Sequence, residues 1–456
     1  MTSSVELQPI AAEQAPAAPV QNAERITALD SLRGFALLGI LLMNIVAMGM
    51  YGAAYDDPTV TGGATGANLG VWAVMHVLAE GKMRCLFSLV FGASVILLTS
   101  RLEARRDAGD VYYRRTLWLL VFGIVHAFLL WEGDILYPYA LCALILYPFR
   151  NVGPKRLLII GAVLLALNAG AYIVQSFGQR EMLQNGRAAE QAEKQGKKLT
   201  DKEKAAKAEY ERWRVFARPT AEELKKDAAE WRGSPLSVIQ ARAKVVGFYH
   251  GMPYYAPMNW DIWCMMFIGM GLIKLGVLSA KRSYRFYALL VLIGYGVGLP
   301  LNTWSAVAII RSNFDPALQT LTQSTYDLGR LSIALGHLGL IMILAKAGWF
   351  RWLMSSLGAV GQMAFSNYIF QSVVTAFLFT GYGFAMYGKL QRYQLYYVVA
   401  AIWVVQLIAS PIWLKYFRFG PLEWCWRSLT YWKRQPMRLR AVELQAPSPE
   451  LSTASS

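Results

Sequence analysis

The residues of this chain that could carry out chemistry are a few titratable side chains inside long apolar segments. A charged side chain at the centre of a bilayer costs roughly 2.5–3.5 kcal/mol on insertion scales. Such a side chain persists there only where it has a function or a partner. Each group described below therefore has a functional and a structural explanation.

The hairpin from Gly123 to Tyr139 holds the first group, in which His126 precedes Glu132 and Asp134 at a tight turn. A neutral imidazole can act as a general base near neutral pH. Either carboxylate could orient that imidazole or bind an acceptor molecule, although about 7 Å of helix rise separates His126 from the turn. The structural alternative is a buried histidine that hydrogen-bonds to a neighbouring helix.

A second histidine, His76, is followed four residues later by Glu80 and then by Lys82 and Arg84. Residues at positions i and i+4 share one helix face, so His76 and Glu80 can interact. This group could perform the same chemistry as His126, on the same outer side of the membrane. A short interfacial helix whose charged side chains extend toward water would also explain it.

An anion-binding group is predicted near the start of the first apolar segment. Asp30 and Arg33 are three residues apart and can pair. Asn44 lies about three helical turns beyond Arg33 and shares its face. These residues could bind the phosphates of a cytoplasmic donor, with Arg84 as a further candidate. A structural ion pair that anchors the helix is the alternative explanation.

Two further groups favour a structural role. Asp327, Arg330 and His337 recur at spacings of three and seven residues on one helix stripe, where a hydrogen bond to a neighbouring helix is expected. Asn367 and Gln371 are four residues apart, and amide hydrogen bonds between packed helices explain them.

Long apolar runs must position all of these residues. The chain is 55% apolar and 16% charged, whereas soluble domains carry about a quarter charged residues. Its apolar runs reach the roughly 20 residues that cross a bilayer core. We therefore predict an all-α fold, a polytopic bundle of about ten transmembrane helices. The predicted spans are 31–51, 85–101, 115–131, 135–149, 156–177, 258–279, 285–308, 330–348, 355–382 and 393–415.

Basic residues between these runs set the expected orientation. The alternate loops 101–115, 150–156 and 280–285 are rich in Lys and Arg, whereas 52–66 and 132–134 contain neither. Basic loops remain in the cytoplasm according to the positive-inside rule. We therefore expect both termini to be cytoplasmic.

Composition divides the chain further. The predicted parts are a disordered cytoplasmic tail at 1–24, an N-terminal transmembrane half at 25–177, a charged helical insert outside the membrane at 178–244, a C-terminal transmembrane half at 245–419, an interfacial cytoplasmic helix at 420–440 and a disordered tail at 441–456. The insert is expected to be a solvated helical spacer on the outer face, with a capping box at Thr220 and Glu223. Residues 67–81 are expected to form a short interfacial or re-entrant helix.

The sequence disfavours several classes of function. A net charge of +16 would suggest nucleic acid in a soluble protein, but here the basic residues lie between apolar runs and no nucleic-acid-binding motif is present. The four cysteines show no paired spacing, so we expect neither a disulfide framework nor a metal site. The chain also has no P-loop, GxSxG, HExxH or Rossmann motif.

Several ordered motifs resemble the YeiB-like family of bacterial membrane proteins, catalogued as domain of unknown function 418. The matching strings are RITALDSLRGFALLGI from Arg25, GKMRCLFSLVFG from Gly81, the hairpin from Arg114 to Tyr139, GQMAFSNY from Gly361 and GPLEW from Gly420. The resemblance covers most of residues 25–435 outside the insert. It implies a multi-pass protein of the bacterial cytoplasmic (inner) membrane.

The string LDSLRG is also similar to the first helix of heparan glucosaminide N-acetyltransferase and related transmembrane acyltransferases. Those enzymes take an acyl group from cytoplasmic acyl-CoA and deliver it across the membrane with an intramembrane histidine. The resemblance implies that Asp30 and Arg33 bind acyl-CoA, such as acetyl-CoA, and that His126, or alternatively His76, is catalytic. The expected partners are membrane lipids and a cell-envelope glycan or lipid acceptor. A transporter or permease for a small solute is the alternative function, because the same polar residues could line a substrate path.

Overall fold

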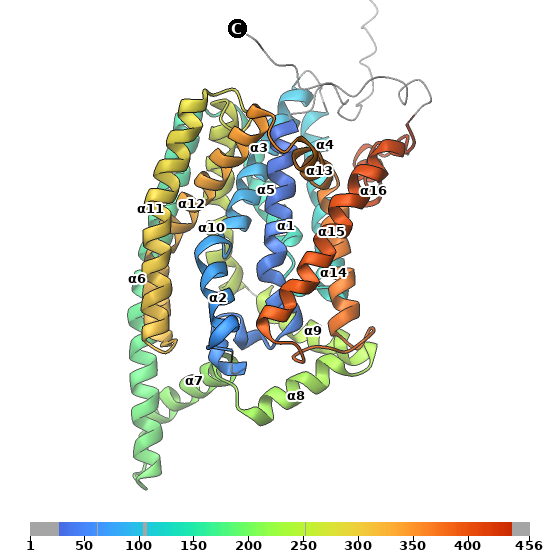
Figure 1. Cartoon of the computed structure of the whole chain (residues 1–456). Helices are drawn as coiled ribbons and strands as arrows, with labels where there is room; N and C mark the ends of the chain where they lie inside the picture. The colour runs from blue at the N-terminus through green and yellow to red at the C-terminus, as the bar shows by residue number, and fades with distance from the viewer. Residues whose placement is uncertain (1–26, 62, 104–106, 251, 440–456) are drawn as a thin grey trace, which may run out of the picture.

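A computed structural model describes residues 27–61, 63–103, 107–250 and 252–439 of the chain (Figure 1). The predicted tails at 1–24 and 441–456 lie outside the described residues. The basic residues Arg105 and Arg106 of the loop 101–115 do so as well.

All elements of regular secondary structure in the described part of the chain are helices. The only pairing of extended backbone within that part is one isolated antiparallel bridge between Phe417 and Arg438. The predicted all-α class is therefore confirmed for these residues. The α-helices are α1 (Thr27–Gly49), α2 (Gly66–Leu78), α3 (Lys82–Leu102), α4 (Ala108–Leu129), α5 (Leu136–Leu146), α6 (Pro154–Lys194), α7 (Asp201–Ala217), α8 (Ala221–Arg232), α9 (Pro235–Tyr249), α10 (Met252–Lys274), α11 (Tyr284–Arg311), α12 (Pro316–Ala347), α13 (Arg351–Gln362), α14 (Ala364–Phe379), α15 (Arg392–Tyr416) and α16 (Pro421–Tyr431). The 3-10 helices are η2 (Gly52–Ala54), η3 (Pro58–Thr61) and η4 (Tyr147–Asn151).

Six helical segments of the described chain are long and apolar enough to cross a membrane. They are Thr27–Gly49, Gly66–Leu102, Pro154–Lys194, Tyr284–Arg311, Pro316–Ala347 and Arg392–Tyr416. The other predicted spans also coincide with helical residues, in α4, in α5 with η4, in α10, and in α13 with α14. The prediction of one continuous helix over 355–382 is wrong, because Met363 separates α13 from α14.

The carboxylate of Glu423 explains the break at Met363. The first N–H groups of a helix have no partner within that helix. Oε1 of Glu423 accepts hydrogen bonds from the N–H groups of Phe365 (2.7 Å) and Ser366 (3.1 Å). Helix α16 therefore caps the start of α14.

The two ends of the bundle are built from different elements. Figure 1 shows the start of α1 together with α16 at one end, and the helices α7 and α8 of the insert at the other. We call these the α16 end and the insert end. Helix α6 extends beyond the rest of the bundle at the insert end, where α7 folds back beside it (Figure 1).

Glycines allow close contact between α1 and α13. A Cβ atom on Gly34 would lie 2.0 Å from the carbonyl oxygen of Leu357, and one on Gly361 would lie 1.9 Å from that of Asp30. Small residues let helix backbones approach in this way inside membranes. The close contact fixes Asp30 and Arg33 next to the break between α13 and α14.

Amide side chains join α14 to α15, as the sequence predicts. The Asn367 amide donates to Ser410 Oγ at 3.0 Å, and the Gln371 amide donates to Gln406 Oε1 at 3.0 Å. All four side chains are buried. The packing interpretation of Asn367 and Gln371 is confirmed.

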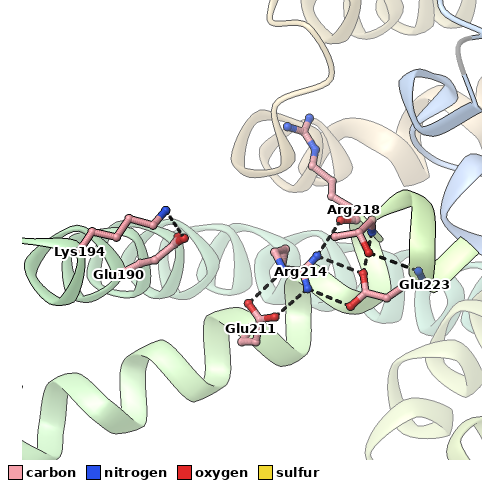
Figure 2. Close-up of polar contacts among 7 residues, drawn as sticks. Glu190, Lys194, Glu211, Arg214, Arg218 and Glu223 are labelled. Atoms are coloured by element: carbon pink, nitrogen blue, oxygen red, sulfur yellow. Dashed lines mark hydrogen bonds and ion pairs between the residues drawn. The ribbon is translucent and has the colours of Figure 1, made fainter.

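The insert forms its helices through local capping. Thr200 begins α7 with a capping box, and the predicted capping box of Thr220 and Glu223 at the start of α8 is confirmed. Figure 2 shows Arg214 at the corner between the two helices, with Nη2 at 2.7 Å from Glu211 and 3.0 Å from Glu223. The hydrogen bond from Arg214 lowers the pKa of Glu223 to about 2.

The prediction that the insert is a solvated spacer is wrong for α8 and α9. The Arg242 side chain of α9 is 1% exposed and Trp231 of α8 is 6% exposed. Arg232 donates to the carbonyl oxygen of Tyr387 in the connection from α14 to α15. The predicted boundaries at 178 and 244 also fall inside α6 and α9, because both helices continue from the bundle into the insert.

Candidate functional site

A cavity of about 520 Å³ lies between α1, α3, α4, α5, α14 and α16. Small-molecule sites typically occupy roughly 300–1,000 Å³. Four arginines and two carboxylates in its lining give a formal net charge of +2. The charged lining residues are Asp30, Arg33, Arg101, Arg115, Glu423 and Arg427.

The charged residues of this lining lie toward the α16 end of their helices, and the lining toward the centre of the bundle is apolar and aromatic. Arg101 lies in the last turn of α3 and Arg115 near the start of α4, next to α16. Ile135 and Leu136 lie at the start of α5, directly after the turn from α4. The cavity is therefore cationic toward the α16 end and apolar toward the centre of the bundle, where Tyr368 also lines it.

The predicted pair of Asp30 and Arg33 is confirmed at the cavity wall. Nη1 of Arg33 lies 2.6 Å from Oδ1 of Asp30. The same guanidinium donates to Ser94 Oγ at 3.2 Å and to the carbonyl oxygen of Gly361 at 3.4 Å. These contacts hold Arg33 rigidly between α1, α3 and α13.

An aromatic contact that the sequence did not suggest positions a second arginine. The Arg115 guanidinium lies 3.7 Å from the centre of the Trp426 ring, and the Trp426 indole N–H donates to the Arg115 carbonyl oxygen at 2.8 Å. A cation over an aromatic face contributes about 0.5–2 kcal/mol. Helix α16 therefore supplies a wall of the cavity and orients one of its cations.

Two of the predicted donor-binding residues lie elsewhere. Asn44 is about 16 Å further along α1 than Arg33 and is not part of the cavity lining. Arg84 forms an ion pair with Asp261 of α10 at 2.7 Å and is also absent from the lining. Of the predicted group, the structure brings only Asp30 and Arg33 to the cavity.

His126 lies in a chain of three polar side chains inside the bundle. Its Nδ1 atom is 2.7 Å from Oδ1 of Asp134, and its Nε2 atom is 2.9 Å from Oγ of Ser372 on α14. The other carboxylate oxygen of Asp134 accepts the Tyr137 N–H at 2.7 Å. All three members of this His126 cluster (His126, Asp134 and Ser372) are at least 98% buried.

Tyr368 separates the His126 cluster from the cavity. Its ring centre lies 5.0 Å from that of His126, and its hydroxyl oxygen accepts the Ile135 N–H at 3.3 Å. Tyr368 and Ile135 both line the cavity, and Ile135 directly follows Asp134 in the chain. The cluster therefore lies directly behind the apolar wall of the cavity.

Glu132 does not orient His126. Its carboxylate is 3.2 Å from Nε of Arg242, which also donates to the carbonyl oxygen of Leu129 and to the Tyr382 hydroxyl. A cation near the C-terminal end of a helix is stabilised by the helix dipole. The guanidinium of Arg242, which belongs to α9, lies at the C-terminal end of α4 and donates to the Leu129 carbonyl oxygen there. Glu132 thus binds the insert to the bundle.

His76 lies apart from His126, in the interface of α2 with α11. Its Nε2 atom is 3.3 Å from Ser305 Oγ, and its ring stacks on Trp72 at 4.9 Å. The structure therefore does not bring Arg33, His76 and His126 to one cavity. His337 contacts the Tyr295 hydroxyl at 2.7 Å and the Leu78 carbonyl oxygen at 3.0 Å, which confirms its predicted hydrogen bond to a neighbouring helix.

A second polar group, which we call the charge cluster, joins residues that the sequence analysis treated separately. Arg330 contacts Asp261 and lies 2.6 Å from Asp327, and Asp327 accepts a hydrogen bond from Asn168 at 2.6 Å. The Tyr326 hydroxyl contacts Glu80 at 2.9 Å. The cluster consists of Glu80, Lys82, Arg84, Asp261, Asp327 and Arg330.

Several of these residues were not predicted from the sequence. Asp261 and Asn168 are polar residues inside predicted spans, and that signal could have identified them. Ser372 carries no such signal, because an isolated serine is common in packed membrane helices. Among the described residues, no group of three or more His, Cys, Asp or Glu side chains is placed to hold a metal ion.

Comparison with known proteins decides the family. The uncharacterized protein YxaH of Bacillus subtilis (strain 168) is 31% identical over 431 residues, which are 92% of this chain and 97% of YxaH. A family model described as a protein of unknown function, DUF418, matches residues 272–433. The chain belongs to the DUF418 family. The uncharacterized protein YeiB of Escherichia coli (strain K12) is 30% identical to this DUF418 chain over 419 residues, covering 89% of the chain and 96% of YeiB. No solved structure matches the chain.

Proposed function

We propose that this chain is a transmembrane acyltransferase that moves an acyl group from cytoplasmic acyl-CoA to an acceptor in the cell envelope. The observation that carries the proposal is the position of His126 and Asp134 behind the apolar wall of an amphiphilic cavity. An acyl-CoA has a matching polarity, because anionic phosphates are joined through a long arm to an apolar acyl thioester. The cationic lining suits the phosphates, and the apolar wall suits the acyl end.

In this proposal His126 is the general base that removes a proton from the attacking group. Asp134 fixes the ring through its contact with Nδ1 and stabilises the imidazolium that forms. Arg33, Arg101 and Arg115 bind the donor phosphates through charge-assisted hydrogen bonds. Tyr368 closes the cavity against water while the donor is absent.

We also propose the membrane arrangement that this reaction needs. The chain crosses a bacterial inner membrane about ten times, with both termini in the cytoplasm and the α16 end of the bundle on that side. The insert then lies on the opposite, extracytoplasmic side. Six long apolar helices, the basic loops and the location of the start of α1 at the same end of the bundle as α16 support this arrangement (Figure 1). The acceptor is an envelope glycan or lipid.

The experiment uses the purified protein in lipid nanodiscs with acyl-CoA donors of several chain lengths, each labelled in the acyl group. An extract of envelope lipids and glycans serves as the acceptor. We expect release of CoA and transfer of the label, both lost in His126→Gln. His337→Gln is the matched control, because His337 contacts the Tyr295 hydroxyl and the Leu78 carbonyl oxygen, away from the His126 cluster. Absence of donor binding and of CoA release with every chain length would refute the proposal.

The charge cluster supports a second candidate function, transport of a small solute. Ionisable groups inside a membrane often couple transport to protons or ions. Glu80, Asp261 and Asp327 together with three cations fit that description. Solute flux by the chain in proteoliposomes that is abolished by Asp327→Asn, without any release of CoA, would favour the transporter.

A further inference from the structure

Ser372 contacts the candidate base, although nothing in its sequence position marks it. It lies in the middle of α14, one turn after the cavity-lining Tyr368. Its Oγ atom is 2.9 Å from Nε2 of His126 and 3.4 Å from the carbonyl oxygen of Tyr368. The contact to His126 spans 246 residues of sequence and joins α4 to α14.

The partners of His126 determine which way its hydrogen bonds run. When Asp134 is ionised its carboxylate only accepts hydrogen bonds, so Nδ1 of a neutral His126 imidazole donates to it. The Nε2 atom of that imidazole then carries the lone pair. In this state the Ser372 hydroxyl donates to Nε2, which is the polarity required to activate a nucleophile.

We propose that Ser372 is a nucleophile that carries the acyl group as an ester between donor and acceptor; this inference rests on the acyl transfer proposed above. The hydrogen-bonded arrangement Asp134–His126–Ser372 matches an acid–histidine–serine triad. Such a triad is recognised by the roles of its members and not by their positions in the sequence. The three side chains come from α4, from the turn after α4 and from α14. No GxSxG motif is needed, because the helix packing positions the hydroxyl.

The reaction proceeds in two balanced steps. The Oγ atom of Ser372 attacks the thioester carbonyl carbon, and its proton passes to Nε2 of His126. The C–S bond breaks, the leaving thiolate takes that proton, and an acyl ester on Ser372 remains. An acceptor hydroxyl or amine then gives a proton to Nε2 and attacks the ester carbonyl. The C–O bond to Ser372 breaks, and Oγ regains the proton.

Tyr368 is the side chain that controls access to Ser372. Ser372 is fully buried, and Tyr368 lies between the cavity and the His126 ring. Rotation of the Tyr368 ring away from His126 would open a path from the cavity to Ser372 for the acyl carbonyl.

The test is acylation of the full-length protein with labelled acyl-CoA in nanodiscs, without acceptor, followed by denaturation and peptide mass spectrometry. We expect one acyl group on the peptide that contains Ser372, bound as an ester that resists neutral hydroxylamine. Ser372→Ala and His126→Gln should each reduce the rate of CoA release roughly 10³-fold or more. Donor binding should stay within a few-fold of the unmodified protein, because neither residue lines the cavity.

Two variants separate chemistry from folding. Ser372→Cys should retain acylation, but as a thioester that neutral hydroxylamine cleaves. Ser176→Ala removes a buried hydroxyl that bonds to the Ile173 carbonyl oxygen within α6, outside the cavity lining, and it should leave CoA release unchanged. Unchanged transfer in Ser372→Ala, or an acyl group on another residue, overturns the nucleophile while leaving the acyltransferase intact. Absence of donor binding and CoA release in the unmodified protein overturns the acyltransferase itself.

Discussion

The Nδ1 atom of His126 lies 2.7 Å from Oδ1 of Asp134, across the turn that joins α4 to α5. Gly123 makes this possible one turn earlier in α4. A Cβ atom there would lie 2.4 Å from the Tyr137 nitrogen and 2.9 Å from Oδ2 of Asp134. The start of α5 can therefore pack directly on α4 and bring the carboxylate back to the imidazole.

Replacing Asp134 tests the orientation of His126. In Asp134→Asn the side-chain amide can donate to Nδ1, which stabilises the wrong tautomer of the imidazole. We expect the rate of acyl transfer to fall roughly 10³–10⁴-fold, with donor affinity nearly unchanged. Single-turnover CoA release gives the rate, and equilibrium titration of a donor analogue gives the affinity. A loss of affinity equal to the loss of rate would assign Asp134 to donor binding.

Replacing Arg115 tests the cationic part of the cavity. In Arg115→Gln the donor loses a charged hydrogen-bond partner worth about 1.5–3 kcal/mol, so its affinity should fall about 10–100-fold. The measurement is titration of acyl-CoA by calorimetry in detergent. Arg285→Gln, at an exposed position at the start of α11, is the matched control and should not change the affinity. Equal affinities in both variants would place the phosphates elsewhere.

A pair of glycine variants tests the contact between α1 and α13. In Gly34→Ala the new methyl group would lie 2.0 Å from a backbone oxygen that has no room to move, so the stability should fall by about 1–3 kcal/mol. In Gly170→Ala the methyl group meets open space on the outer face of α6. That variant should be neutral or slightly more stable. Thermal unfolding in detergent measures both, and equal midpoints would argue against the close contact.

Double substitution tests the pairing within the charge cluster. Arg330→Met alone leaves Asp327 and Asp261 buried without their shared partner, which should cost about 3–5 kcal/mol. Adding Asp327→Asn should recover part of that loss, because one uncompensated charge disappears. Unfolding midpoints of the two single variants and the double variant give the coupling. Strict additivity would show that the pair contributes nothing.

Removing Arg242 tests whether the insert is fixed to the bundle. In Arg242→Ala the contacts to Glu132, the Leu129 carbonyl oxygen and Tyr382 are lost. The Glu132 carboxylate then remains without its ion-pair partner, which weakens the packing of α9 on the bundle. We expect α9 to detach more often, so trypsin should cleave the insert at least several-fold faster. Lys244→Ala is the control, since Lys244 pairs with Glu230 at the surface of the insert. Equal cleavage rates would mean that other contacts hold the insert.

Sequence patterns predict most of the helices because their cause is local. Apolar run length locates the long helices, and the Thr220 capping box locates the start of α8. The break at Met363 was not predictable, because the capping group is the carboxylate of Glu423. That carboxylate accepts a hydrogen bond from the N–H of Phe365, 58 residues earlier in the chain. The burial of α8 and α9 was missed for a similar reason, since Arg242 finds its partners on α4 and near the end of α14.

The candidate site shows the same division. The pair of Asp30 and Arg33 was predictable from a spacing of three residues on one helix. Asn44 shares that helix face but not the cavity, because the face extends far beyond a cavity that ends near Tyr368. The contact of His126 with Ser372 depends on how α4 and α14 pack, which no spacing in the sequence encodes.

A structure of the protein with a non-transferable thioether analogue of acyl-CoA bound would show directly where the donor lies. We predict the phosphates beside Arg33, Arg101 and Arg115, and the acyl end against Tyr368, facing His126 and Ser372. A bound analogue whose acyl end lies away from Tyr368, or a cavity that stays empty at saturating analogue, would contradict acyl transfer by His126 at this cavity.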